Sequence, residues 1–420
     1  MLPRQPLHAS RPGALANSPR SPRNARRVTP DRRLKTGYFV LEGLNSFATT
    51  LYLYYLYFFM QSRFGFDNRE NLALAALNGL CYMLGSWWGG RFAQRHGYFL
   101  SLKLGFGIMA ASLALGANLH TATGQIVAMV VMVAGMCLTW PTLEALVSEG
   151  ESPAGLQRMI GIYNIGWAGT AALAYFTGGA LLERFGLNSM FYVPICILLL
   201  QLALTLWLET QARVGAAAGV IADIGGPVEL NPRPIARARA FLRMAWLANP
   251  FAYIAINTLV AVMPGIARRL ELSTTAAGFC CSLWCFARLG AFFGLWFWTG
   301  WHYKFRWLLA AFLTLIATFV VILTVPQLVV LLAAQLIFGG ALGLIYYSSL
   351  FYSMGVGETK SEHGGIHEAA IGLGNLAGPA VGAASLHFLP QYANSGAVAV
   401  SLLLVGGLGG LLAIWRTTKA

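Results

Sequence analysis

The chain has 420 residues, of which 57% are hydrophobic and 10% are charged, and its formal net charge is +14 at pH 7. A soluble globular protein has about 25% charged residues, so this composition excludes that class and indicates a chain embedded in lipid. A high positive charge is also typical of nucleic-acid-binding proteins, but here the basic residues lie between apolar segments, and we expect no nucleic-acid partner.

The first 36 residues form a basic segment without an apolar run. They are rich in Arg, Pro, Ser and Asn, whereas a secretory signal needs about 7–15 consecutive apolar residues. We therefore predict that residues 1–36 are a disordered tail and not a cleaved leader. Its nine lysine and arginine residues favour a cytoplasmic N-terminus.

Twelve apolar segments follow, each close to the length of about 20 residues that crosses a bilayer as a helix. The predicted spans are 38–60, 72–92, 99–119, 125–147, 160–182, 187–208, 246–267, 274–299, 305–325, 327–352, 365–388 and 394–415. They predict an all-α integral membrane protein with twelve transmembrane helices in two pseudo-symmetric six-helix lobes, residues 37–208 and 246–416.

A polar interval, residues 209–245, separates the two sets of spans. It holds Arg213, Asp223, Glu229 and further arginines, together with three prolines. Ionised side chains are costly in lipid, and proline lacks a backbone donor, so this interval is predicted to be a cytoplasmic loop. Residues 417–420 form a second, short cytoplasmic end.

The lysine and arginine residues are concentrated on one set of predicted loops. With the tail inside, the cytoplasmic segments and span ends hold 23 of the 29 basic residues, the opposite side holds five, and Arg288 lies in the middle of a span. This positive-inside pattern predicts a multi-pass protein of the plasma membrane or the bacterial inner membrane, with both termini in the cytoplasm.

The two halves of the chain repeat a local pattern. Gly85-Ser-Trp-Trp-Gly89, near the end of the second span, matches Gly290-Ala-Phe-Phe-Gly294, near the end of the eighth, and a basic turn follows each. A repeated six-span unit is typical of transporters whose substrate site lies between two lobes near the membrane midplane.

The predicted loop between the second and third spans contains Gly-Arg-Phe-Ala-Gln-Arg-His-Gly, from Gly90 to Gly97. It resembles the G-x-L-a-D-R-x-G-R signature of the major facilitator superfamily, although Gln94 and Tyr98 replace the usual aspartate and last arginine. The resemblance implies that helices one, four, seven and ten surround a central cavity, and that this loop takes part in gating. We expect Gly90 and Gly97 to form the turn, and Arg95 to meet a carboxylate or a helix C-terminus.

A second familiar string lies in the eleventh predicted span, where Gly374, Gly378, Pro379 and Gly382 follow one another. It is similar to the glycine–proline motif of drug–proton antiporters in the superfamily, but there the motif lies in the fifth span. We therefore assign no antiporter activity and interpret the string as a site of close packing, with a kink, between the two lobes.

Polar side chains follow one face of the four helices that the resemblance places around the cavity. The candidates are Glu42, Asn45 and Thr49 in the first span, Trp140 and Glu144 in the fourth, Tyr253 and Asn257 in the seventh, and Gln335 and Tyr346 in the tenth. For the amides and the hydroxyl taken singly, hydrogen bonding to a neighbouring helix is an equally good interpretation. The two carboxylates favour a functional site, since they are expensive within a span, although both lie near the predicted cytoplasmic end, where water has access.

His367 and Glu368 begin the eleventh predicted span at its cytoplasmic edge. This position suits a gating contact or a group that responds to pH. A carboxylate at the start of a helix also interacts favourably with the helix dipole, and the sequence leaves both interpretations open.

Arg288 lies about halfway along the eighth predicted span, with apolar residues on either side. An arginine at the centre of a membrane helix costs about 2.5–3.5 kcal/mol on insertion scales, so it needs protein or water around it and a partner. The partner is either a carboxylate such as Glu144, in an ion pair that ties the lobes together, or an anionic or polar group of a substrate.

These features predict a monomeric secondary active transporter that moves a small solute across the membrane by alternating access. Coupling to protons through Glu42 or Glu144 is left open. We expect no enzyme activity, cofactor or metal, because the sequence has no phosphate-binding loop, metal-ligand pair or nucleophile elbow. The rival interpretation is a membrane receptor or assembly partner of the same fold that transports nothing. The polar faces of the four helices argue against it, because such a protein does not need a water-filled central cavity.

Overall fold

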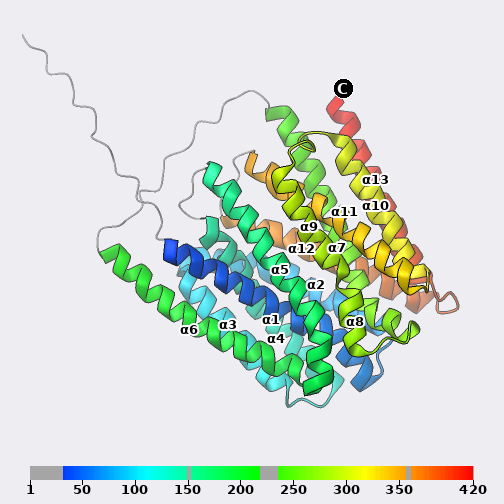
Figure 1. Ribbon diagram of the computed structural model, residues 1–420, viewed down its shortest axis with the longest axis horizontal. Coiled ribbons are helices and arrows are strands. Elements are labelled where there is room, and N and C mark those ends of the chain that lie inside the picture. The colour runs from blue at the N-terminus through cyan, green and yellow to red at the C-terminus, as the bar shows by residue number, and fades with distance from the viewer. Residues whose placement is uncertain (1–31, 149–152, 218–234, 356–360, 420) are drawn as a thin grey trace, which may run out of the picture.

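The described part of the chain is entirely helical, as its composition predicts. A computed structural model describes residues 32–148, 153–217, 235–355 and 361–419. In these ranges the helices are α1 (Arg32–Phe64), α2 (Asn68–His96), α3 (Tyr98–Gly116), α4 (Ala122–Ser148), α5 (Pro153–Phe185), α6 (Ser189–Ala217), α7 (Ile235–Arg269), α8 (Thr274–Cys281), α9 (Leu283–Phe297), α10 (Phe305–Thr324), α11 (Leu328–Gly355), α12 (Ser361–Phe388) and α13 (Ser395–Lys419) (Figure 1).

The helices account for the twelve predicted membrane spans. Ten segments in the described ranges are long and apolar enough to cross a membrane, with α8 and α9 counted together as one segment. The first two helices, α1 and α2, have 33 and 29 residues, which is more than a bilayer requires, but they carry more polar side chains than the others. The chain is therefore a multi-pass integral membrane protein.

The eighth predicted span is broken rather than continuous. Ser282 separates α8 from α9, although its φ of −90° and ψ of −7° remain in the right-handed helical region. Beside this break, Nε2 of Gln335 on α11 donates a hydrogen bond of 2.9 Å to the carbonyl of Cys280. A side chain that enters the helical hydrogen-bond ladder is one of the known causes of such an interruption.

Several helices extend beyond the apolar spans that predict them. The first helix begins at Arg32, inside the predicted tail, and Nζ of Lys35 donates to the carbonyls of Leu146 (3.3 Å) and Val147 (2.8 Å) on α4. Likewise α6 continues to Ala217 and α7 begins at Ile235, so both ends of the predicted loop 209–245 are helical. The rest of that loop, 218–234, and the tail residues 1–31 lie outside the described residues.

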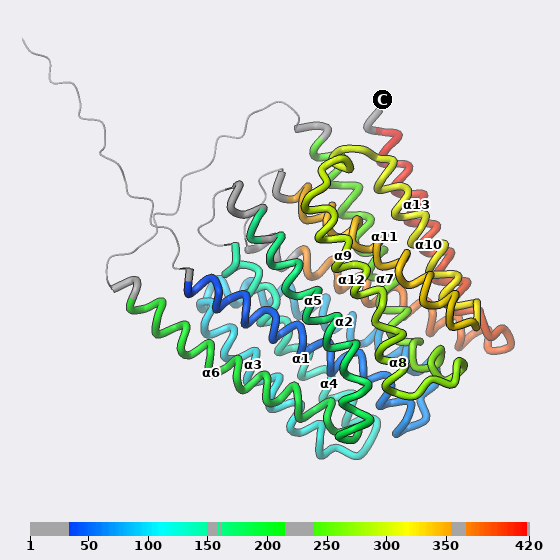
Figure 2. The backbone as a smooth tube through the Cα atoms, viewed as in Figure 1, coloured from blue at the N-terminus to red at the C-terminus, as the bar shows by residue number. Residues whose placement is uncertain are grey.

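The helices pack into two groups, which lie to the lower left and the upper right in Figures 1 and 2. In the first group α1 packs against α4, α5 and α6, and α3 packs against α4 and α6. In the second group α7 packs against α11, α12 and α13, and α10 packs against α11 and α13. We call the first group, α1–α6, the N lobe and the second, α7–α13, the C lobe.

Two sets of helices join the lobes: α2 packs extensively against α12, and α5 packs against α8 and α9. Glycine permits both approaches. The backbone of α12 at Asn375 and Leu376 lies directly against Gly79 of α2, and the backbone of Thr274 lies against Gly179 of α5. Small residues at membrane-helix interfaces allow such backbone contact, where a larger side chain would hold the helices apart.

The glycine–proline string of α12 makes different contacts from those predicted. Gly374 and Gly378 face the backbone of α7 at Pro250 and Ile254, within the C lobe. In this string it is the last glycine, Gly382, that faces the other lobe, at Leu72 of α2. The prediction that the string as a whole packs between the lobes is thus corrected, because its first two glycines point towards α7.

We expect Gly79→Val to lower the free energy of unfolding by about 1–3 kcal/mol, because the added side chain would collide with the backbone of α12, which cannot rotate away. The measurement is thermal unfolding of the purified protein. Gly107→Val is a matched control, since a Cβ atom at Gly107 on α3 meets no atom within 4 Å. Equal unfolding midpoints for the two variants would contradict the close approach of α2 and α12.

Candidate functional site

Arg288 on α9 is buried between the lobes, with only 3% of its surface exposed. Its guanidinium carbon lies 4.5 Å from the ring centre of Trp167 on α5 and 4.9 Å from that of Trp284, one turn earlier on α9. A desolvated cation–π contact is worth about 2 kcal/mol or more. Two tryptophans, one from each lobe, therefore hold the arginine.

The guanidinium has no acceptor in the described part of the chain. None of the described residues forms an ion pair with Arg288, and its Nε is covered and makes no hydrogen bond. The ion pair with Glu144, one of the two predicted partners, is thus not formed in this conformation. Because a buried donor without an acceptor costs about 1–3 kcal/mol, the arrangement favours an additional group that accepts hydrogen bonds here.

Trp167 is held in position by its own helix, α5, and by two neighbouring helices. Its Nε1 donates to Oδ1 of Asn164 (3.1 Å), and its carbonyl accepts from the hydroxyl of Ser46 on α1 (2.7 Å). Its ring meets that of Tyr346 on α11 at a centroid distance of 5.3 Å. Trp167 is thus buried in the interior of the protein.

The charge of Arg288 acts on three tyrosine side chains. Tyr54 on α1, Tyr253 on α7 and Tyr346 on α11 all interact electrostatically with Arg288. Tyr54 stacks on Trp284 at 6.4 Å between ring centroids, and the rings of Tyr253 and Tyr346 are 6.3 Å apart. Both lobes thus contribute phenol groups to the surroundings of a single cation.

Two carboxylates from opposite lobes lie near the same tyrosines. Glu144 on α4 and Glu368 on α12 interact electrostatically with each other, and both interact with Tyr253 and Tyr346. Oε2 of Glu368 accepts a 2.6 Å hydrogen bond from the hydroxyl of Tyr82 on α2, which crosses between the lobes. Oε2 of Glu144 is covered and has no hydrogen-bond partner among the described residues.

The sequence suggests a helix start for His367 and Glu368, but α12 begins earlier, at Ser361, so both residues lie in its second turn. The carboxylate of Glu368 bonds to Tyr82 rather than to the N-terminus of its own helix. The ring of His367 is 6.3 Å from that of Tyr346, and its Nε2 is covered without a partner in the described ranges.

Glu42 on α1 is fully buried, and neither of its carboxylate oxygens has a hydrogen-bond partner among the described residues. Its Oε2 lies close to Gly166 on α5, and Tyr163 on the same helix interacts electrostatically with it. Tyr163 also interacts electrostatically with Glu144 and Glu368.

Other predicted site residues are engaged in helix packing: Asn45, Thr49, Trp140, Asn257 and Gln335. The amide of Asn257 donates to Oδ1 of Asn375 on α12, and the hydroxyl of Thr49 donates to the carbonyl of Asn45 in its own helix (2.8 Å). The Trp140 side chain packs against the core. Asn45, Asn257 and Gln335 thus make hydrogen bonds to neighbouring helices, as in the structural alternative, whereas Thr49 bonds within its own helix.

Most of the signature from Gly90 to Gly97 lies in the last turns of α2, and its final glycine forms the turn. Gly97 forms the turn, with φ of +94°, and its N–H donates to the carbonyl of Ala93 (2.9 Å), which explains the glycine. Gly90 is buried inside α2, so the prediction that it forms the turn is corrected: the helix continues through it. Arg95 is exposed in the last turn of α2, where a cation interacts favourably with the helix C-terminus, one of its two expected partners.

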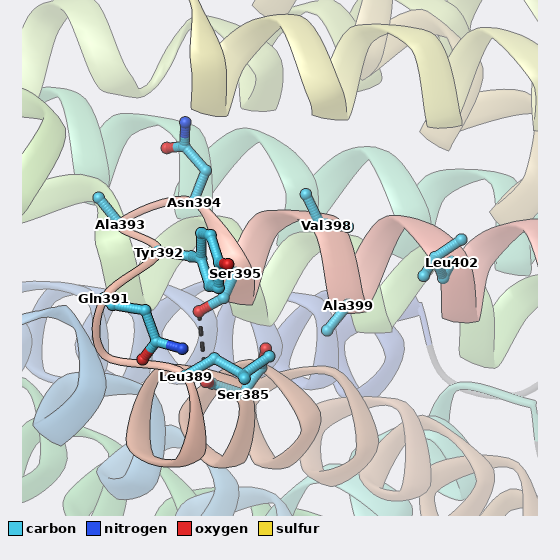
Figure 3. Close-up of a pocket in the computed structure, with 10 residues that line it drawn as sticks. All are labelled: Ser385, Leu389, Gln391, Tyr392, Ala393, Asn394, Ser395, Val398, Ala399 and Leu402. Carbon is cyan, nitrogen blue, oxygen red and sulfur yellow. Dashed lines mark hydrogen bonds between the residues drawn. The ribbon is translucent and has the colours of Figure 1, made fainter.

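A cavity of about 580 Å³ lies elsewhere, at the hairpin between α12 and α13 (Figure 3). Its lining residues are Ser385, Leu389, Gln391, Tyr392, Ala393, Asn394, Ser395, Val398, Ala399 and Leu402, none of which is charged. The buried charged groups Arg288, Glu144 and Glu368 lie between the lobes instead, and we take the cluster around them as the candidate functional site.

Comparison with known proteins agrees with the fold. The sequence profile of the Major Facilitator Superfamily matches residues 38–364. Among solved structures, the nucleoside transporter NupG is 14% identical (92% of this chain and 100% of that chain covered, TM-score 0.66). A bacterial homolog of the human lysosomal transporter Spinster is 14% identical (92% and 95%, TM-score 0.59), and the human organic anion transporter TETRAN is 16% identical (92% and 99%, TM-score 0.62). These identities show the fold alone, and no curated protein matches the chain.

We expect that adding Glu144→Gln will not restore the membrane expression or stability that Arg288→Ala loses, because tryptophan rings rather than a carboxylate hold the guanidinium. The measurement is a double-mutant cycle on membrane expression and thermal unfolding. The two substitutions should be additive to within about 0.5 kcal/mol, as for groups that do not touch.

A cycle of Arg288→Ala with Trp167→Leu is the matched control. Because these two side chains are in contact, their coupling should reach about 0.5–3 kcal/mol. Recovery of expression in the Arg288→Ala/Glu144→Gln protein would show that the ion pair exists after all.

Proposed function

The chain belongs to the Major Facilitator Superfamily, and from that premise we propose that it is a secondary active transporter of a small solute that carries an anionic group. The observation behind the choice of solute is Arg288, which is buried between the lobes and lacks an acceptor in the described ranges. A carboxylate, phosphate or sulfonate group would supply acceptors in the plane of the guanidinium, a geometry that favours arginine over lysine.

Alternating access requires a site that both lobes contact, so that closing one side of the protein accompanies opening the other. The candidate site fits this requirement. Its N-lobe residues are Glu42, Tyr54, Glu144 and Trp167, and its C-lobe residues are Tyr253, Trp284, Arg288, Tyr346 and Glu368. A solute bound to Arg288 would touch both sets and would lose part of its contacts when the lobes separate.

Glu42 is the residue that we propose for proton coupling. An ionised carboxylate with no donor is strongly disfavoured in a dry interior, so the present environment of Glu42 suits the neutral acid. A conformation that admits water to Glu42 would release the proton. The same side chain would then carry a proton across the barrier with each conformational cycle.

We also propose that both termini face the cytoplasm and that the protein works as a monomer in a plasma membrane or bacterial inner membrane. The orientation is supported by the distribution of lysine and arginine, 23 of which lie on the loops of one side. The candidate site is assembled within a single chain, so transport needs no second copy.

A thermal-shift panel of small carboxylates, phosphates and sulfonates tests the proposed function, because a ligand that binds only the native protein raises its stability. We expect at least one anion to stabilise the wild type and to bind Arg288→Lys at least about tenfold more weakly, since the forked donors are lost. The control is Arg213→Lys, an exposed arginine that should leave binding unchanged. Equal stabilisation of wild type and Arg288→Lys, or no stabilisation by any anion, would refute the role of Arg288.

We expect Glu42→Gln to abolish accumulation of that anion against a proton gradient in proteoliposomes while retaining counterflow exchange. Gln keeps the shape of the side chain but cannot carry a proton, and exchange moves no net proton. Glu271→Gln, at an exposed glutamate outside the helices, is the control and should leave both activities intact. Equal loss of accumulation and exchange in Glu42→Gln would point to folding or binding instead of coupling.

A further inference from the structure

Charges of both signs lie at the interface between the lobes. In the described ranges these are Arg288 and the carboxylates Glu144 and Glu368, whereas Lys35 is bound to carbonyls at the end of α4. An anionic solute would satisfy Arg288 but would leave Glu144 and Glu368 without a cation. A cationic solute would leave Arg288 without an acceptor.

The opposite charges share neighbours but do not meet. Tyr253 and Tyr346 interact electrostatically with Arg288 and also with Glu144 and Glu368. No ion pair joins Arg288 to either carboxylate in the described part of the chain. We call the surroundings of Arg288 the cationic end of this cluster and those of Glu144 and Glu368 its acidic end. The ring of Tyr346 is 5.3 Å from that of Trp167, which contacts Arg288, and 6.3 Å from that of His367, which precedes Glu368.

The acidic end has the chemistry to bind an ammonium group. Glu144 has an oxygen without a partner, and the one side-chain hydrogen bond to Glu368 in the described ranges comes from the neutral hydroxyl of Tyr82. An ammonium group has three donors, which two carboxylates from different helices can share. Aromatic faces such as those of Tyr253 and Tyr346 add a favourable surface for a cation.

We propose that the solute is a zwitterion, with its carboxylate bound by Arg288 and its ammonium group bound by Glu144 and Glu368. This inference rests on the proposed transport function and narrows its substrate class to amino acids or short peptides. Such a solute joins the lobes at both ends, since Arg288 touches Trp167 of the N lobe, while Glu144 and Glu368 belong to different lobes. Glu42, fully covered in this conformation, remains available for the proton.

Two sets of probes separate the charges. Each set contains a zwitterion (L-phenylalanine or alanylphenylalanine), its N-acetyl derivative, which is only an anion, and its carboxamide, which is only a cation. Binding to the purified full-length protein is measured by the change in tryptophan fluorescence, since Trp167 and Trp284 adjoin the site, and by thermal shift. We expect at least one zwitterion to bind about tenfold more tightly than either derivative, because each derivative leaves one buried charge unpaired.

Conservative variants identify the residues responsible. Glu368→Gln retains an oxygen that accepts from Tyr82, so it keeps the contact between the lobes. In Glu368→Gln and Glu144→Gln we expect the preference for the zwitterion over the N-acetyl anion to fall below about threefold, while binding of the anion itself persists. Arg288→Lys should lose both ligands, and the exposed control Glu271→Gln should behave as the wild type.

Each other outcome has a definite meaning. If an N-acetyl anion binds as tightly as its zwitterion and depends on Arg288, the zwitterion proposal is overturned while the proposed function holds. If the carboxamides bind best and depend on Glu144 and Glu368, both the zwitterion and the anion-binding role of Arg288 are overturned. If no probe binds in a way that depends on Arg288, the zwitterion proposal is overturned, and the panel of carboxylates, phosphates and sulfonates decides separately whether Arg288 binds an anion.

Discussion

The Arg288 side chain is buried between two membrane-embedded lobes. The arrangement of the candidate functional site depends on this constraint. Placing an arginine at the middle of a membrane helix costs about 2.5–3.5 kcal/mol. Two cation–π contacts, each worth about 2 kcal/mol or more when desolvated, offset a cost of that size without a counter-ion. The arginine can thus remain charged and buried while its N–H donors stay available. An ion pair with Glu144 would have offset the cost too, but it would have used those donors.

The contacts that join the lobes differ in how easily they can change. Backbone packing at Gly79 and Gly179 is close and depends on the absence of a side chain, so it favours one relative position of the lobes. The groups in polar contacts such as Tyr82–Glu368 can bond to water or solute when the lobes separate. The net free-energy cost of this change is small, because one hydrogen bond replaces another. A site made of polar groups at a glycine-lined interface therefore suits a protein whose lobes separate and rejoin. Alternating access needs both properties, a well-defined closed state and exchangeable central contacts.

The candidate site could be predicted in part. Glu144, Arg288, Tyr253, Tyr346 and Glu368 are candidates from the sequence, since charge or helical spacing marks them, and the structure brings them together. Tyr54, Tyr82 and Trp284 were missed, because aromatic residues make up 13% of the chain and nothing in the local sequence distinguishes these from the rest. The bond between Tyr82 and Glu368 joins residues 286 positions apart, a pairing that no local pattern contains.

The sequence by itself determined the class of protein and the number of membrane-crossing segments. The free energy of transferring a segment of about 20 residues from water to lipid depends on the residues of that segment. The composition and spacing of apolar residues therefore suffice to identify the membrane-crossing segments. The tertiary structure decided which groups meet: tryptophan rather than glutamate beside Arg288, Gln335 at the break near Ser282, and Gly97 rather than Gly90 in the turn. It also decided that α1, α6 and α7 continue past their apolar spans. Those outcomes depend on neighbouring helices, and the free energy of a contact between helices is not a property of either segment alone.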